Sequence, residues 1–167
     1  RASASIPPSA ATTVTTTVAV APAAPAVAPS TFLLVPFEQP TIADPRGADM
    51  TRSLLAKLQE HKLDAKVGPS IDHFSAVTNA QQLCTASGTQ AIIIPNVRIE
   101  QSSATGRSHA SLRLTELSCT GSVLGHGAAE ADMGQAFIVN FGAAVVGVTE
   151  RAMAPAIEQL FPNAPKP

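Results

Sequence analysis

Cys84 and Cys119 are the only two cysteines among the 167 residues, and the sequence leaves few possible chemical roles for them. Cys84 lies in a predicted helix just before an apolar strand, and Cys119 ends the strand that follows. Two cysteines without CxxC spacing supply half a metal site, and neither has a local histidine motif that would activate it as a nucleophile. We expect one structural disulfide, formed in an oxidising compartment. Two unrelated buried thiols are the alternative.

The four histidines are the next residues that could do chemistry, and no two of them have the i, i+4 spacing of helical metal ligands: His61, His73, His109 and His126. Glu130 and Asp132 follow His126, and in a helix the three would form part of a metal-binding face. Glycines on both sides of His126 favour a solvated loop or strand instead. A small hydrolase or ligand-binding enzyme centred on His126, Glu130 and Asp132 is kept as an alternative function.

No glycine-rich or serine-centred motif supports an enzyme. Gly121, Gly125 and Gly127 match neither the P-loop nor the dinucleotide-binding fingerprint, and no serine lies in a nucleophile elbow. We therefore expect a non-enzymatic protein that binds no cofactor and no metal.

Two sets of residues could contact a partner protein. Arg98, Arg107 and Arg113 could line one face of a predicted hairpin, although a solvated strand face is the simpler explanation of them. Phe137 and Phe141 belong to an uncharged stretch with more apolar surface than one helix face can hide. That stretch is either core, a subunit or partner interface, or a segment that inserts at a membrane surface.

The composition argues against two classes of partner. The net charge is −1, only 14% of the residues are charged, and Tyr and Trp are absent. Such a chain lacks both the positive field and the stacking side chains that nucleic-acid binding requires. No run of 18 uncharged apolar residues is present, so we also expect no segment that spans a membrane.

The chain divides by composition into a tether, a domain and a tail. Residues 1–30 are rich in Ala, Pro, Thr and Ser, which cannot bury enough apolar surface to offset chain entropy. We predict a disordered tether over 1–30, a single domain over 31–162, and a disordered tail over 163–167.

Hydrophobic periodicity and turn residues give the elements of that domain. Asp49 is the expected N-cap of the first helix and Gly88 the expected C-cap of the second, and Pro155 is expected either to kink the last helix or to break it into two near Ala154. The strands are predicted at 32–37, 63–67, 91–99, 110–117 and 122–127, and the helices at 50–61, 75–87 and 142–160. This order, β-α-β-α-β-β-β-α, predicts an α/β (α+β) fold with a single mixed sheet of about five strands.

Three segments together resemble a family of bacterial envelope domains. They are the opening strand from Phe32 to Phe37, the helix that carries Leu54 to Leu58, and the run from Ala80 to Ile94, in which a helix, a glycine turn and an apolar strand follow one another. The segments 112–117 and 119–121 are similar to the next strand and its "TG" turn. The family includes the N-terminal domain of the Tol-system propeller protein, the curli-secretion lipoprotein and the lipoprotein activators of peptidoglycan synthases.

The resemblance covers residues 32–161 and implies a non-enzymatic domain that docks other envelope proteins, often at the end of a Pro-rich tether. We therefore expect a periplasmic or secreted accessory domain, or adaptor, that binds a protein partner in the cell envelope. A self-assembling envelope or extracellular subunit, and thus a homo-oligomer, is the first alternative.

Overall fold

The computed structural model describes residues 31–38, 46–102, 107–133 and 141–167, which form one mixed five-stranded sheet with helices packed on it. The order of strands in the sheet is β2-β1-β3-β4-β5. This confirms the predicted α/β (α+β) class and element order, with one predicted helix divided in two. The elements are β1 (Thr31–Leu34), α1 (Arg46–Glu60), β2 (Asp64–Val67), α2 (His73–Thr78), α3 (Ala80–Ser87), β3 (Ala91–Ser102), β4 (Arg107–Ser118), β5 (Val123–Met133) and α4 (Phe141–Leu160).

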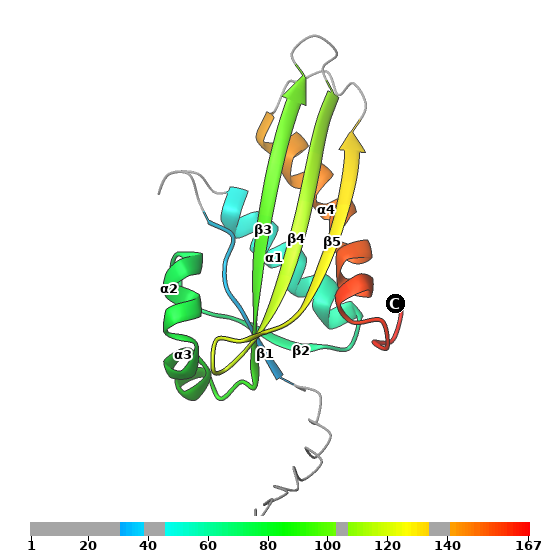
Figure 1. Ribbon diagram of the computed structural model, residues 1–167. Coiled ribbons are helices and arrows are strands. Elements are labelled where there is room, and N and C mark those ends of the chain that lie inside the picture. The colour runs from blue at the N-terminus through cyan, green and yellow to red at the C-terminus, as the bar shows by residue number, and fades with distance from the viewer. Residues whose placement is uncertain (1–30, 39–45, 103–106, 134–140) are drawn as a thin grey trace, which may run out of the picture.

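The sheet has a short parallel half and a long antiparallel half. β1 pairs in parallel with β2 and with β3, and its pairing with β3 ends at Ile93. β3 and β4 pair over their whole length, from Ala91 opposite Ser118 to Ser102 opposite Arg107. In Figure 1, β3, β4 and β5 therefore extend well past β1 and β2. Pro95 is tolerated inside β3 because it lies where β1 has already ended, so no β1 carbonyl faces the missing N–H.

The two faces of the sheet are covered unequally. Helices α1 and α4 lie along one face (Figure 1), where Leu34, Ile93 and Leu114 pack against Leu54 and Ile157. Helices α2 and α3 cover only one end of the other face. There Ala76, Ala80 and Cys84 pack against side chains that all lie near that end: Leu33, Val35, Ile92, Ile94 and Leu117. Among the described helices, none covers the far half of β3, β4 and β5 on this side.

The predicted helix over 75–87 is divided at Asn79. Its start is earlier than predicted because the Asp72 carboxylate accepts a 2.8 Å hydrogen bond from the Ser75 N–H and forms the N-cap. The break follows from competition for backbone carbonyls, because the Asn79 side-chain amide donates to Ser75 O and the Thr78 hydroxyl donates to Phe74 O. Gly88 closes α3 with a positive φ of 65°, as expected for a C-cap.

Other boundaries also differ from those predicted: β1 ends at Leu34 and not at residue 37, β3 continues to Ser102, and β4 already begins at Arg107. α1 begins at Arg46, so Asp49 is not its N-cap but lies in its first turn, where it pairs with Arg52. β5 continues to Met133, well past residue 127. α4 passes through Pro155 as one element. β5 was underestimated because its second half consists of small and polar residues, and only pairing with β4 makes that half extended.

Residues after α4 turn back against the end of α1. The Pro165 carbonyl oxygen lies 3.0 Å from His61 Nδ1, and the Phe161 ring meets the Phe32 ring edge-on at 5.1 Å between centroids. His61, which directly follows α1, is 1% exposed and anchors this segment. The range 163–167, predicted to be a tail, includes that contact.

Candidate functional site: the open face of the sheet

The half of the β3-β4-β5 sheet on which none of the described helices packs presents polar side chains from three strands, and we call it the open face. Side chains alternate across a strand, so every second residue of each strand points to this side. The strand register then fixes which residues are neighbours. The open face consists of Asn96, Arg98, Glu100, Arg107, His109, Ser111, Arg113, Thr115, His126, Ala128, Glu130 and Asp132.

His109 is the centre of a hydrogen-bonded network on the open face. Its Nδ1 lies 3.0 Å from Asp132 Oδ1, directly across the β4–β5 ladder. Its Nε2 lies 3.3 Å from Ser111 Oγ and 4.0 Å from Glu130 Oε2. The hydrogen bond to Asp132, with further attraction from the charges of Asp132, Glu130 and Glu100, raises the pKa of His109 above its ordinary value.

The hydrogen bonds that connect Ser111 to His109 and His109 to Asp132 follow the order of a nucleophilic triad, but the surroundings do not suit that chemistry. A triad needs free N–H donors that stabilise an oxyanion beside the nucleophile. Ser111 lies in β4, a central strand paired on both sides, so the sheet ladders use its backbone groups. The Ser111 hydroxyl also contacts Glu130 Oε1 at 3.4 Å, which competes with His109 for its proton.

The predicted centre of His126, Glu130 and Asp132 is not assembled. All three lie on the same face of β5, but His126 contacts Thr115 Oγ1 at 3.2 Å, whereas Glu130 and Asp132 lie beside His109. Four residues of extended strand separate His126 from Glu130 by roughly 13 Å. In the part of the chain that the structure describes, no group of three or more His, Cys, Asp or Glu side chains could hold a metal ion.

The three arginines predicted to line one face of the hairpin do lie on the open face. Arg98 Nε is 3.1 Å from Glu100 Oε1, and Arg113 is exposed opposite Asn96. Arg107 lies at the far end, opposite Ser102. Phe137 is outside the described residues. Phe141 begins α4, and its side chain is likewise outside the described part.

A disulfide joins Cys84 in α3 to Cys119 after β4, with 5.7 Å between their Cα atoms. It is the pairing that the sequence predicts. Helix α3 packs on one end of the sheet. The disulfide links this helix to the residue that directly follows β4, the strand that carries His109.

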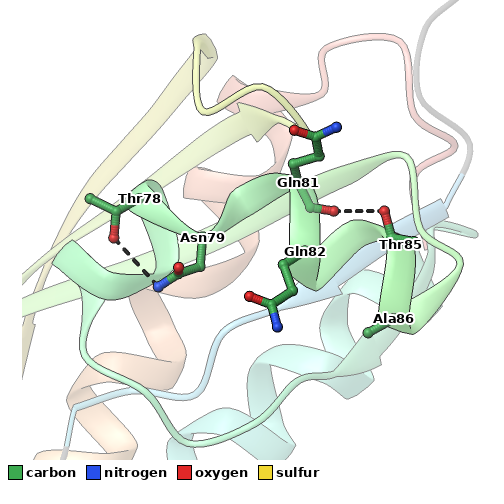
Figure 2. Close-up of a pocket in the computed structure, with 6 residues that line it drawn as sticks. All are labelled: Thr78, Asn79, Gln81, Gln82, Thr85 and Ala86. Atoms are coloured by element: carbon green, nitrogen blue, oxygen red, sulfur yellow. Dashed lines mark hydrogen bonds between the residues drawn. The ribbon is translucent and has the colours of Figure 1, made fainter.

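A second polar surface lies on the outer side of α2 and α3, where a shallow hollow of about 560 Å³ opens to solvent. Figure 2 shows that its lining comes from α3 and the break that precedes it. The lining is neutral, with amides and hydroxyls from Asn79, Gln81, Gln82 and Thr85.

None of the helices in the described ranges is long and apolar enough to cross a bilayer.

The His109 network gives a first prediction. Replacing Asp132 with asparagine is expected to lower the pKa of His109, because the hydrogen bond to the Asp132 carboxylate is the largest cause of its elevation. Because the pKa is higher in the folded chain, the pair stabilises the fold most below the ordinary value of 6.5 and less as pH rises through the folded pKa.

NMR titration of the His109 ring measures this shift. Glu100→Gln is the matched control, since Glu100 is the weakest of the contributing charges and should move the pKa less. An identical titration curve in Asp132→Asn and the unsubstituted protein would contradict the assigned network.

Comparison with known proteins bears on the fold. No protein-family model matches this chain, and no curated protein matches its sequence. Among solved structures, the lipoprotein GNA1162 from Neisseria meningitidis has a TM-score of 0.52 at 17% identity, covering 72% of this chain and 94% of that one. The PelC dodecamer from Paraburkholderia phytofirmans has a TM-score of 0.51 at 11% identity, covering 76% and 86%.

The hypothetical protein CT253 from Chlamydia trachomatis has a TM-score of 0.50 at 10% identity, covering 81% of this chain and all of that one. At such identities the likeness concerns the path of the backbone. The chain thus shares its fold with a lipoprotein and other proteins of bacteria, in agreement with the expected α/β class.

Proposed function

We propose that this protein is a non-enzymatic accessory domain of the bacterial cell envelope that binds a protein partner through the open face. The observation that carries the proposal is the half of the β3-β4-β5 sheet on which none of the described helices packs, and which presents charges of both signs from three paired strands. The shared fold with a Neisseria lipoprotein and the disulfide support an envelope location.

The open face is a better docking surface than the edges of the sheet, because both long edges are partly blocked. On the outer edge of β5, Gln159 from α4 accepts a hydrogen bond from the Ala128 N–H, and Arg151 donates to Asp132 O at 3.3 Å. On the outer edge of β3, Pro95 has no N–H to offer. Such devices oppose the addition of a partner strand.

The charges of the open face indicate what the partner must present. Glu100 and Asp132 flank His109 in one row across the sheet, Arg98 and Glu130 flank Ser111 in the next row toward α2 and α3, and Arg113 lies one row further in that direction. A partner surface with basic residues opposite Glu130 and Asp132 and acidic residues opposite Arg98 and Arg113 would be complementary. We expect its association rate to fall as ionic strength rises.

Site-specific photocrosslinking tests this proposal. A photoreactive residue in place of Thr115 on the open face should capture a partner in envelope membranes, and one in place of Arg52 on α1 should not. With the captured protein purified, Arg98→Glu combined with Arg113→Glu should weaken binding by about tenfold or more. Arg52→Glu is the matched charge-reversal control. Equal crosslinking from both positions, or equal affinity of both variants, would refute the open face as the docking surface.

Self-assembly is the second candidate function, favoured by the dodecameric state of PelC, whose fold this chain shares. The open face of one copy would then meet another copy instead of a different protein. Light scattering on a size-exclusion column decides between the two, since a protein that stays monomeric over a wide concentration range does not self-assemble.

A further inference from the structure

Glu116 is a carboxylate on the apolar side of the sheet. It follows Ala110, Leu112 and Leu114 at every second position of β4, so it points toward α1 and α4, away from the open face. The residue is only 8% exposed. Charged side chains are seldom buried to this extent without a partner.

A missing side chain on the neighbouring strand makes room for the Glu116 carboxylate. Its cross-strand neighbour in β5 is Gly125. A Cβ atom added at Gly125 would lie 3.8 Å from Glu116 Oε2 and 3.1 Å from Leu160 Cδ1. The glycine therefore leaves a gap between the strand and the end of α4, and the carboxylate occupies one side of it.

This gap belongs to a pocket of about 370 Å³ whose other walls are mostly apolar. The apolar lining comes from β1, from the residue before β2, and from the end of α4 with the residues that follow it: Phe32, Leu63, Leu160, Phe161, Pro162 and Ala164. Asn163 adds one neutral amide. The outer wall is held in place, since His61 binds Pro165 and the Lys166 ammonium lies 3.5 Å from the Glu158 carboxylate.

The pocket lacks a positive charge to match its negative one. No hydrogen bond or ion pair engages the Glu116 carboxylate within the described residues, and Glu116 is the sole ionisable residue that they contribute to the lining. Burial accordingly raises the pKa of Glu116. Partial burial makes the charged form of this carboxylate less favourable, and a cation bound in the pocket would offset that cost.

We propose that this pocket binds a primary ammonium group on an aliphatic stem, with the ammonium on the Glu116 carboxylate and the methylene groups against Phe32, Leu160 and Phe161. A single carboxylate in an apolar pocket suits a compact point charge, whereas a planar guanidinium needs several acceptors around it. The same chemistry is found in a lysine side chain of another protein and in a free alkylamine. The pocket is on the opposite side of the sheet from the open face, so the two proposals stand or fall separately.

Calorimetric titration with two probes tests this site in the intact protein. The probes are n-pentylamine for the free amine and Nα-acetyl-lysine N-methylamide for the protein side chain. We expect saturable binding of at least one of them, weakened tenfold or more in Glu116→Gln. Glu130→Gln, which removes a carboxylate from the open face, is the matched control and should bind normally.

Two further readouts separate ion pairing from simple filling of a cavity. In a pH range where the free Glu116 carboxyl is partly protonated, binding should release protons, because pairing with an ammonium lowers the raised pKa of Glu116; the measured enthalpy should then depend on the ionisation heat of the buffer. n-Pentanol, which has the same stem without the charge, should bind at least tenfold more weakly than n-pentylamine.

The outcomes are decisive in both directions. Preference for the lysine derivative identifies a protein side chain as the ligand, and preference for n-pentylamine identifies a free amine. Equal binding by Glu116→Gln, equal binding of n-pentanol, or no saturable binding of either amine to the unsubstituted protein would overturn the proposal. Thermal unfolding of Glu116→Gln shows whether a loss of binding reflects a loss of fold.

Discussion

Replacing Cys84 and Cys119 together with alanine is expected to lower the free energy of unfolding by about 4 kcal/mol. The disulfide closes a loop with a sequence separation of 35 residues. On the chain-entropy model, opening a loop of this length frees the unfolded chain by roughly that amount. The loss is a large share of the 5 to 15 kcal/mol that is typical of a single domain.

Urea unfolding of both proteins under oxidising conditions measures this difference, and their m-values show whether the unfolded states are equally expanded. Hydrogen exchange should place the loosening first in α2 and α3, which reach the sheet through small side chains such as Ala76 and Ala80. The unsubstituted protein with reductant is the matched control and should resemble the double variant. A loss below about 1 kcal/mol would mean that the bond contributes little to stability.

Replacing Gly127 with alanine is expected to destabilise the fold by about 3 kcal/mol, because α4 packs directly on this glycine. An added Cβ atom would lie 2.0 Å from Ala156 O, 2.8 Å from Leu160 Cβ and 2.9 Å from Leu160 N. Two of these three atoms belong to the backbone, so no side-chain rotation relieves the clash. The helix must move away from β5, which opens the core that contains Ile157 and Leu114.

Gly147→Ala is the matched control for this prediction. It lies in α4 itself, and its added Cβ atom would meet only the flexible end of Met133 at 3.4 Å. We expect it to be neutral or to stabilise the helix by up to about 1 kcal/mol. Chemical denaturation of both variants gives the comparison. If Gly127→Ala were as stable as Gly147→Ala, the close approach of α4 to β5 would be wrong.

The Gly127 variant also distinguishes the two proposed binding surfaces. Leu160 both contacts the added Cβ atom and lines the pocket of Glu116. Displacement of α4 should therefore weaken amine binding more than it weakens docking at the open face, whose residues lie on the other side of the sheet.

Local patterns in the sequence determined most of the fold. Phe32 to Val35 and Ala91 to Ile94 are apolar runs that only a buried strand accommodates, and the alternation at 110, 112 and 114 requires a strand with one buried face. The capping role of Gly88 and the pairing of Cys84 with Cys119 also follow from residue type and spacing. These features depend on a few neighbouring residues, so one sequence suffices.

Only the tertiary structure decided what the polar residues do. The sequence grouped His126 with Glu130 and Asp132 because the three are close along the chain. In the β4–β5 register, however, it is His109 of β4 that lies beside Glu130 and Asp132. The alternation that predicted β4 also puts Glu116 on the buried face. That its carboxylate lines a pocket depends on Gly125 and on the end of α4, which only the tertiary structure shows. Pairing register and helix docking arise from contacts between distant residues, and a local pattern in a single chain carries no information about them.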